Sequence, residues 1–299
     1  MCGIIVMKTK KKGVKMKISL IITVYNRFEY VENILKCLIK QSVQPYEVIF
    51  TDDGSKEDLK EILKKYKGKC EFKIKYIYQE DLGFRKSKAC NNAVIESEGD
   101  YLVFLDQDAI FPDNLIETFI QNKKENKFSI LRVIWSENDE RIDIQKILEK
   151  NNWGYDEIIQ KVSINHFKVL KRYLWKDKYN NFRYRIGLRD RGTGLMGIGF
   201  ALFKKDYIEI NGYDEDYKGW GGEDADLGLR LYALGLKSVT FSTKIPSIHM
   251  CHPLDPTKSG NQNKKIYNEK KEKIIKGNYK CTYGIENRKD LDGYYFEEI

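Results

Sequence analysis

The 299-residue sequence predicts an α/β fold with a mostly parallel central sheet flanked by helices. Short apolar runs rich in β-branched residues alternate with segments of helical apolar spacing over the first 105 residues. Such alternation is typical of parallel strands joined by right-handed crossovers. Hydrophobic residues make up 41% of the chain, which is enough to build a sizeable core.

The first half of the chain can be assigned element by element. Residues 18–24 form a β-branched run that predicts a buried strand, and apolar residues at 31, 34, 35, 38 and 39 predict a helix over 29–40. In the same way we expect strands at 47–51, 72–78 and 101–105, and helices at 56–66 and 87–97.

The second half is less regular. Charged and aromatic residues interleave from about 113 to 190, and we expect helices and loops there, without a strand. The hydrophobic pattern becomes regular again in 192–256, where we find an apolar run at 198–203 and expect a helix at 226–234 and a strand at 238–242.

The net charge of +9 lies in the flanks of the chain. Residues 1–17 and residues 258–280 each carry +6, residues 281–299 carry −3, and residues 18–257 sum to zero. A nucleic-acid-binding protein would carry its positive charge on the folded body, so we expect no nucleic-acid partner. Lysine-rich flanks fit either an anionic membrane surface or a solvated tail. We therefore divide off a basic extension at 1–16 and a basic, helical C-terminal tail at 257–299.

The sequence contains few indications of the cellular compartment in which the protein works. Six cysteines show no paired metal spacing, and we expect them to be reduced thiols. No run approaches about 18 apolar residues, and no secretory signal pattern is present. We expect a cytoplasmic protein, with the inner face of the plasma membrane as the place of any lysine-driven attachment.

Polar residues follow the first two predicted strands. Thr23 and Tyr25 follow one, and Asp53 follows the other. Ligands of open parallel sheets lie outside the carboxyl ends of the strands, so Asp53 could accept from a nucleobase edge while Tyr25 stacks on its face. The alternative is an ordinary turn in which Asp and Ser cap the next helix.

The fourth predicted strand ends in Asp106-Gln107-Asp108. Two carboxylates at i and i+2 can reach one divalent cation, and Mg²⁺ or Mn²⁺ prefers such oxygens and often shares them with phosphates. The alternative is a solvated loop with a helix cap.

A dense acidic motif covers residues 219–226, which read Gly-Trp-Gly-Gly-Glu-Asp-Ala-Asp. Three carboxylates within four residues repel one another unless something compensates. Carboxylates beside an aromatic ring suit a sugar site. The alternative is a helix N-terminus that favours acids, and both interpretations can hold together.

Two of the three histidines, His249 and His252, are three residues apart. This spacing can offer two imidazoles to a metal ion. His166 is better explained as a packing or surface residue.

These motifs resemble known glycosyltransferases. Residues 17–112 resemble a family 2 glycosyltransferase of the GT-A type, including Gly83-Phe-Arg-Lys86 with Asn91-Asn92. Residues 194–252 resemble the C-terminal region of the β-1,4-galactosyltransferases and, more loosely, of chondroitin polymerase. The matching stretches are 199–206, Asn211-Gly-Tyr and Gly219-Trp-Gly-Gly-Glu-Asp224. The resemblance implies a donor-binding half at 17–112 and an acceptor-binding and catalytic half at 113–256.

The resemblance also implies roles for individual residues. Asp53 would contact uracil in a pocket lined by Thr23 and Tyr25, and Arg85 or Lys86 would lie near the diphosphate. Asp106 and Asp108 match the Asp-x-Asp motif, His252 matches the family's metal-binding histidine, and His249 stands where the galactosyltransferases use a methionine ligand. Asp224 matches the catalytic base, and Trp220, Gly221, Gly222 and Glu223 match the acceptor and donor-sugar pocket. Ala225 departs from the usual run of three aspartates.

The implied activity is metal-dependent, inverting transfer of a hexose or N-acetylhexosamine from a UDP-sugar to a hydroxyl of a glycan or glycolipid, forming a β-linkage. Mn²⁺ or Mg²⁺ would be the cofactor. A sugar-nucleotide nucleotidyltransferase is one alternative, but its glycine-rich phosphate loop is missing from 23–27. A non-catalytic protein of anionic membrane surfaces is the other.

Overall fold

A computed structural model describes residues 16–253 and 262–299. Its centre is an eight-stranded sheet of order β11-β3-β2-β1-β4-β8-β6-β9, in which β8 and β11 run against the other six strands. The strands are β1 (Ile18–Val24), β2 (Glu47–Asp52), β3 (Lys73–Tyr78), β4 (Tyr101–Asp106), β6 (Lys127–Leu131), β8 (Gly199–Phe203), β9 (Lys237–Phe241) and β11 (Tyr295–Glu298). The predicted α/β class with a mostly parallel sheet is confirmed.

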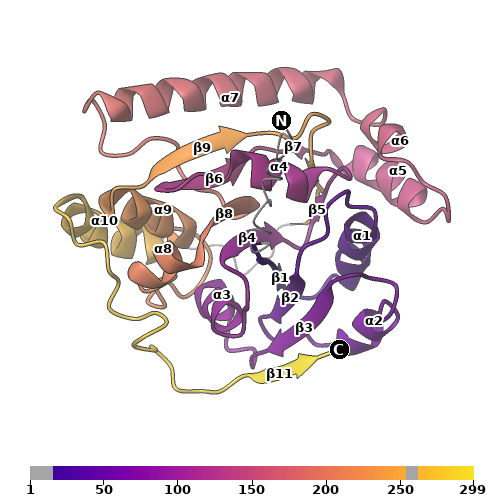
Figure 1. The fold of residues 1–299 in the computed structure, drawn as a ribbon, viewed down its shortest axis with the longest axis horizontal. Coiled ribbons are helices and arrows are strands. Elements are labelled where there is room, and N and C mark those ends of the chain that lie inside the picture. Colours follow the sequence, from indigo (N-terminus) through magenta and orange to yellow (C-terminus); the bar gives the residue numbers. More distant parts are fainter. Residues whose placement is uncertain (1–15, 254–261) are drawn as a thin grey trace, which may run out of the picture.

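Helices cover both faces of the sheet (Figure 1). One buried cluster joins it to α1, α2 and α4–α7, and the other joins it to α3, α8 and α9. The helices are α1 (Phe28–Ile39), α2 (Lys60–Lys64), α3 (Lys86–Ile95), α4 (Leu115–Asn122), α5 (Asn138–Leu148), α6 (Tyr155–Ile159), α7 (Ile164–Arg185), α8 (Lys204–Glu209), α9 (Glu223–Ala233) and α10 (Gln262–Ile275). The fold is thus a three-layer sandwich with the sheet in the middle.

A second, three-stranded sheet stands beside the carboxyl end of β4. It consists of β5 (Ala109–Ile110), β10 (Ile248–His249) and β7 (Ile134–Trp135), with β10 in the middle. β5 follows directly on Asp106-Gln107-Asp108, so this sheet brings the histidine segment to the acidic motif.

Two expectations about local structure are wrong. The region 113–190 contains strands β6 and β7, and β6 is a full member of the central sheet between β8 and β9. Its sequence, Lys-Phe-Ser-Ile-Leu, is too short to show a period, and its partners lie about 70 and 110 residues further along the chain. The predicted helix at 56–66 shrinks to the five residues of α2.

The C-terminal tail is helical only in part. Residues 262–275 form α10, but the segment after Cys281 runs along the molecule without a helix and ends in β11, which pairs antiparallel with β3 (Figure 1). It is held in place by ion pairs with the folded body. Residues 1–15 of the predicted basic extension at 1–16 lie outside the described residues.

Within the described residues, no helix combines the length and apolarity needed to cross a membrane.

Candidate active site

The carboxyl ends of β1 and β4 meet a lysine at the start of α3, Lys86, whose side chain is 12% exposed. Thr23 and Asp106 are register partners at these ends, and the Thr23 hydroxyl donates to Asp106 Oδ1 at 3.2 Å. Lys86 Nζ lies 2.9 Å from the same oxygen and 3.9 Å from Asp224 Oδ1. Burial opposes the charge on Lys86, but the two carboxylates outweigh it and hold the pKa of Lys86 well above its usual value. Burial likewise opposes ionisation of Asp106, yet Lys86 holds the pKa of Asp106 below its usual range.

A second cluster contains Asp108, His249 and His252, whose ligand atoms all lie within 4.8 Å of one another. His252 Nε2 is 3.1 Å from Asp108 Oδ2, and His249 Nε2 is 3.4 Å from Asp108 Oδ1. His252 Nδ1 lies 2.9 Å from the carbonyl oxygen of Pro253. Because a carbonyl oxygen only accepts, Nδ1 is the donor of this contact, which leaves Nε2 as the ring atom that faces Asp108 and could serve as a metal ligand.

This cluster has the donors that a divalent cation requires. One carboxylate and two imidazoles form a set that suits Mn²⁺ better than Mg²⁺, because Mg²⁺ prefers oxygen ligands. Asp108 Oδ1 is buried, and no hydrogen bond to it is present among the described residues. A bound cation would compensate this buried oxygen, so the residues fit a metal site.

Asp224 lies in the first turn of α9, and both of its oxygens are fixed. The Tyr213 hydroxyl donates to Oδ1 at 2.7 Å, and the Gly197 N–H donates to Oδ2 at 2.9 Å. A Cβ atom at Gly197 would stand 2.3 Å from Lys86 Nζ and 2.6 Å from Asp224 Oδ2, so any other residue here would displace the ammonium or the carboxylate. The carboxylate is held in one orientation with its side chain still 22% exposed.

The rest of the acidic motif divides into different roles. Glu223 is buried, its Oε2 has no hydrogen-bond partner in the described chain, and burial together with the Asp224 charge raises the pKa of Glu223 to about 7. Asp226 points inward and forms an ion pair with Arg230 at 2.6 Å, which makes it a structural residue. Trp220 is 53% exposed on a loop in which Gly219, Gly221 and Gly222 all have positive φ, a conformation that favours glycine.

The residues predicted to contact uracil lie at or just after the carboxyl ends of the neighbouring strands β1 and β2. Asp53 is buried after β2; Gln79 Nε2 donates to its Oδ1 and the Arg85 N–H to its Oδ2, both at 2.6 Å. Each oxygen keeps a second lone pair for a ligand. Burial nevertheless raises the pKa of Asp53 to about 7. The Tyr25 hydroxyl donates to Asp81 at 3.2 Å. Arg85, one of the two residues predicted near the diphosphate, has its guanidinium paired with Asp292 at 2.9 Å.

Comparison with known proteins decides the family. The family model described as "Glycosyl transferase family 2" matches residues 19–208, more than half of the chain. The chain belongs to this family. A second family model, described as "N-terminal domain of galactosyltransferase", matches residues 177–253 and so covers Trp220, Asp224 and both cluster histidines. The family is one of glycosyltransferases, as the motifs predicted.

The similar proteins are sugar-transferring enzymes. The family 2 chain is 29% identical over 266 residues to a hyaluronan synthase of Pasteurella multocida, covering 84% of this chain but only 26% of that protein. It is 30% identical over 234 residues to a chondroitin synthase of Escherichia coli, covering 73% of this chain and 32% of that protein. The chain therefore spans about a quarter to a third of the length of these curated relatives.

A solved structure with the same fold is the S. aureus TarS fragment 1–349 in complex with UDP-GlcNAc. The TM-score is 0.58 at 16% identity, with 91% of this chain and 69% of that chain covered. This likeness shows the fold, which is GT-A, as predicted.

Sequence reasoning missed three contributors to the site of this family 2 chain. Trp135, in the region that could not be assigned, stacks on His249 with ring centroids 4.0 Å apart. Tyr213 stood inside a quoted motif, but nothing in the sequence shows that its hydroxyl reaches Asp224. Gly197 gives no signal at all, because its role depends on the fold bringing Lys86 and Asp224 together.

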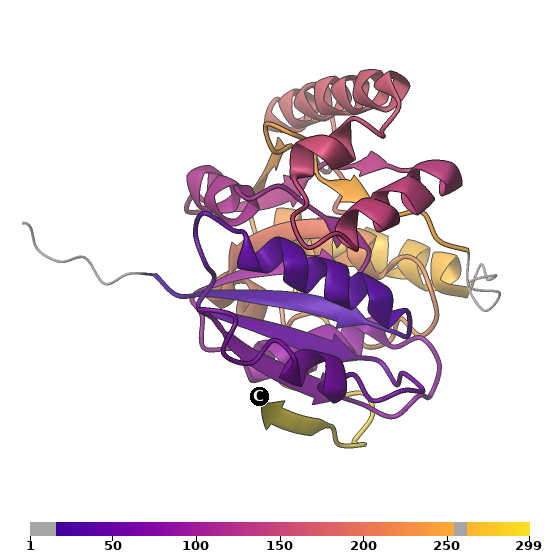
Figure 2. The same cartoon turned by 90° about the vertical axis from the view of Figure 1, so that its right-hand side faces the viewer.

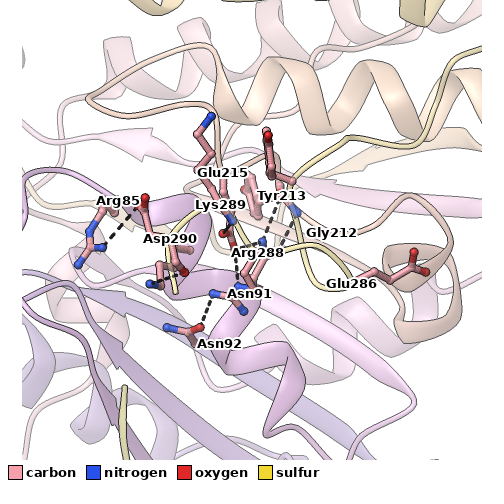
Figure 3. Close-up of polar contacts among 12 residues, drawn as sticks. Arg85, Asn91, Asn92, Gly212, Tyr213, Glu215, Glu286, Arg288, Lys289 and Asp290 are labelled. Carbon is pink, nitrogen blue, oxygen red and sulfur yellow. Dashed lines mark hydrogen bonds and ion pairs between the residues drawn. The ribbon is translucent and has the colours of Figure 1, made fainter. Parts of the chain in front are cut away.

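The C-terminal segment forms a further part of the surroundings of the site (Figure 3). Glu215 is buried; Arg288 Nε lies 3.0 Å from its Oε1, and the backbone N–H of Lys289 donates to its Oε2 at 3.0 Å. Asn91 donates to Glu215 and to the carbonyl of Tyr213, both at 2.9 Å. The segment is thus connected by hydrogen bonds to the residue that orients Asp224.

Proposed function

We propose that this protein is a metal-dependent, inverting glycosyltransferase that moves a hexose or N-acetylhexosamine from a UDP-sugar to a hydroxyl of a glycan or glycolipid acceptor. The observation that carries the proposal is the placement of a fixed carboxylate, Asp224, beside a lysine-bridged Asp106 at the strand ends. A candidate metal cluster, Asp108 with His249 and His252, follows directly on the same strand. A sugar transfer with a nucleoside diphosphate as leaving group requires a base for the acceptor hydroxyl and positive charge for the diphosphate, and these residues could supply both.

The donor would lie over the ends of β1 and β2. Asp53 would accept from the uracil edge, with Thr23 and Tyr25 lining the same pocket. Lys86, rather than Arg85, would be the cation near the diphosphate, since Arg85 is already paired with Asp292. We propose that residues 17–112 form the donor half of the domain and 113–256 the acceptor and catalytic half.

The metal site would hold Mn²⁺, or Mg²⁺, through Asp108, His249 and His252. When bound, the cation supplies positive charge that stabilises the nucleoside diphosphate as it leaves. Trp135 packs against the His249 ring and fixes its orientation.

Asp224 would act as the general base. It takes the proton from the acceptor hydroxyl while that oxygen forms a bond to the anomeric carbon, and the bond from this carbon to the phosphate oxygen breaks with its electron pair going to the diphosphate. A single displacement inverts the anomeric configuration, so an α-linked donor gives a β-glycoside. Trp220, on its glycine loop, would cover the sugar and exclude water.

Paired variants separate the two roles. We expect D108N to weaken Mn²⁺-dependent UDP binding, measured by calorimetry. We expect D224N to bind UDP and Mn²⁺ normally while transfer, or donor hydrolysis by water, falls by about 10²–10⁴-fold, the usual contribution of a general base. A D224N enzyme of normal rate would contradict the base assignment, and D108N with normal Mn²⁺ dependence would contradict the metal site.

A further inference from the structure

Helix α7 stands at the outside of the molecule. It is straight, 22 residues long, and runs along one edge of the fold in both views (Figure 1, Figure 2). At 1.5 Å per residue it is about 33 Å long. Of its side chains only Leu170 and Asp177 are buried, so most of its surface is without a partner in the described chain.

The face opposite these buried residues carries an apolar stripe. Trp175, Tyr179, Phe182 and Ile186 follow one another at spacings of four, three and four residues, which places them on one side of a helix. Their exposed fractions are 75%, 55%, 57% and 52%. Large apolar side chains gathered in a row on the surface mark an interaction site, whereas isolated ones need no explanation.

Basic residues border this stripe on both sides. Lys171, Lys178 and Arg185 repeat every seven residues along one border, and Arg172, Lys176 and Arg183 lie along the other. α7 contains seven basic residues and a single acid, Asp177.

The single acid of α7 does not weaken this positive field. Asp177 is directed into the protein, where Arg132 Nε lies 2.6 Å from its Oδ2. The outward faces of α7 are therefore positive throughout.

We propose that α7 lies flat on the surface of an anionic lipid bilayer, with the stripe of Trp175, Tyr179, Phe182 and Ile186 in the interfacial region. Tryptophan and tyrosine favour the headgroup level, and lysine and arginine on both borders extend to the phosphates. A second copy of this chain fits the surface less well, because it would bring two strongly positive helices together. The proposal concerns attachment and does not depend on the proposed function.

Vesicle flotation at low and high salt tests the proposal on the full chain. The vesicles contain phosphatidylcholine alone or mixed with phosphatidylglycerol. We expect binding to the anionic vesicles, reduced by salt. K171E/K178E should weaken it at least about 25-fold at low salt, since each basic residue contributes about fivefold. K264E/K265E, on exposed positions of α10, which carries five lysines and two acids, is the matched control and should bind within about twofold of wild type.

The apolar stripe has its own pair of variants. W175S/F182S should weaken binding about tenfold. L82S/L291S, which removes two exposed leucines elsewhere, should leave it unchanged. Brominated lipids should quench the tryptophan emission of wild type much more than that of W175F. Circular dichroism melting checks that each variant is folded.

Three results would overturn the proposal. The first is no binding to anionic vesicles, and the second is equal loss in the α7 and α10 charge variants. The third is a dimer in lipid-free sedimentation that W175S/F182S abolishes, which would make the stripe a protein interface.

Discussion

Removing one hydroxyl tests how the candidate base is held. Tyr213 is fully buried, and its ring lies 6.2–6.4 Å from the rings of Phe104, Phe200 and Tyr207. Tyr213→Phe keeps this packing and deletes only the donor to Asp224 Oδ1. Asp224 then retains one hydrogen bond, from the Gly197 N–H, and the ion pair with Lys86 at 3.9 Å.

The size of the effect follows from the charge and exposure of the acceptor. A hydrogen bond to a charged group contributes about 1.5–3 kcal/mol to stability. Because the Asp224 side chain is 22% exposed, water can replace part of the lost bond, and we expect about 1–2 kcal/mol. Donor hydrolysis should fall about tenfold, the rate equivalent of 1.4 kcal/mol, if the orientation of Asp224 limits it.

A double-mutant cycle with Asp224→Ala isolates this bond. The free energies of unfolding of wild type, Y213F, D224A and Y213F/D224A are measured in urea, and we expect a coupling of about 1–2 kcal/mol. Tyr207→Phe is the control, since the Tyr207 hydroxyl donates to Asn91 and not to Asp224. A coupling below about 0.5 kcal/mol would refute the idea that Tyr213 holds the base.

Three further changes test other parts of the structure. The contribution of Glu223 to the free energy of unfolding should fall as pH rises from about 4.5 to 7, since Glu223 binds its proton more tightly in the folded state. E223Q should therefore gain up to about 3 kcal/mol relative to wild type between pH 5 and 8. A difference between the two proteins that does not depend on pH would contradict the raised pKa of Glu223. W135A should weaken Mn²⁺ binding about tenfold in calorimetry by freeing the His249 ring, and unchanged affinity would exclude a positioning role. R288A should destabilise the fold by about 2–3 kcal/mol in chemical denaturation because it leaves the buried Glu215 partly unpaired, and an unchanged midpoint would show that the C-terminal segment is not anchored there.

The strands and strand ends of residues 17–112 could be predicted from sequence because their signals are local. The β-branched run at 18–24 indicates a strand by itself. The carboxylates at 53, 106 and 108 each lie within two residues of the end of a strand. The His249 and His252 pair could be proposed as ligands from their spacing together with the acidic motif at 106–108, and the structure places both beside Asp108.

The missed features depend on contacts between distant segments. β6 is a strand because β8 and β9 flank it, and β11 is one because β3 offers a free edge. Arg85 was predicted to lie near the diphosphate because its actual partner, Asp292, is 207 residues further along the chain and could not be inferred from the sequence. The basic surface of α7 was missed because its charges are balanced by acids elsewhere in residues 18–257, whose net charge is zero.

The most direct test of the central claim is a donor screen. The protein is incubated with Mn²⁺ and, in turn, UDP-Gal, UDP-GalNAc, UDP-Glc, UDP-GlcNAc and UDP-GlcA, and UDP release is measured with and without chelator. The account predicts slow, chelator-sensitive hydrolysis of one donor, lost in D224N. No UDP binding by calorimetry in the presence of Mn²⁺, together with no hydrolysis of any donor, would contradict it.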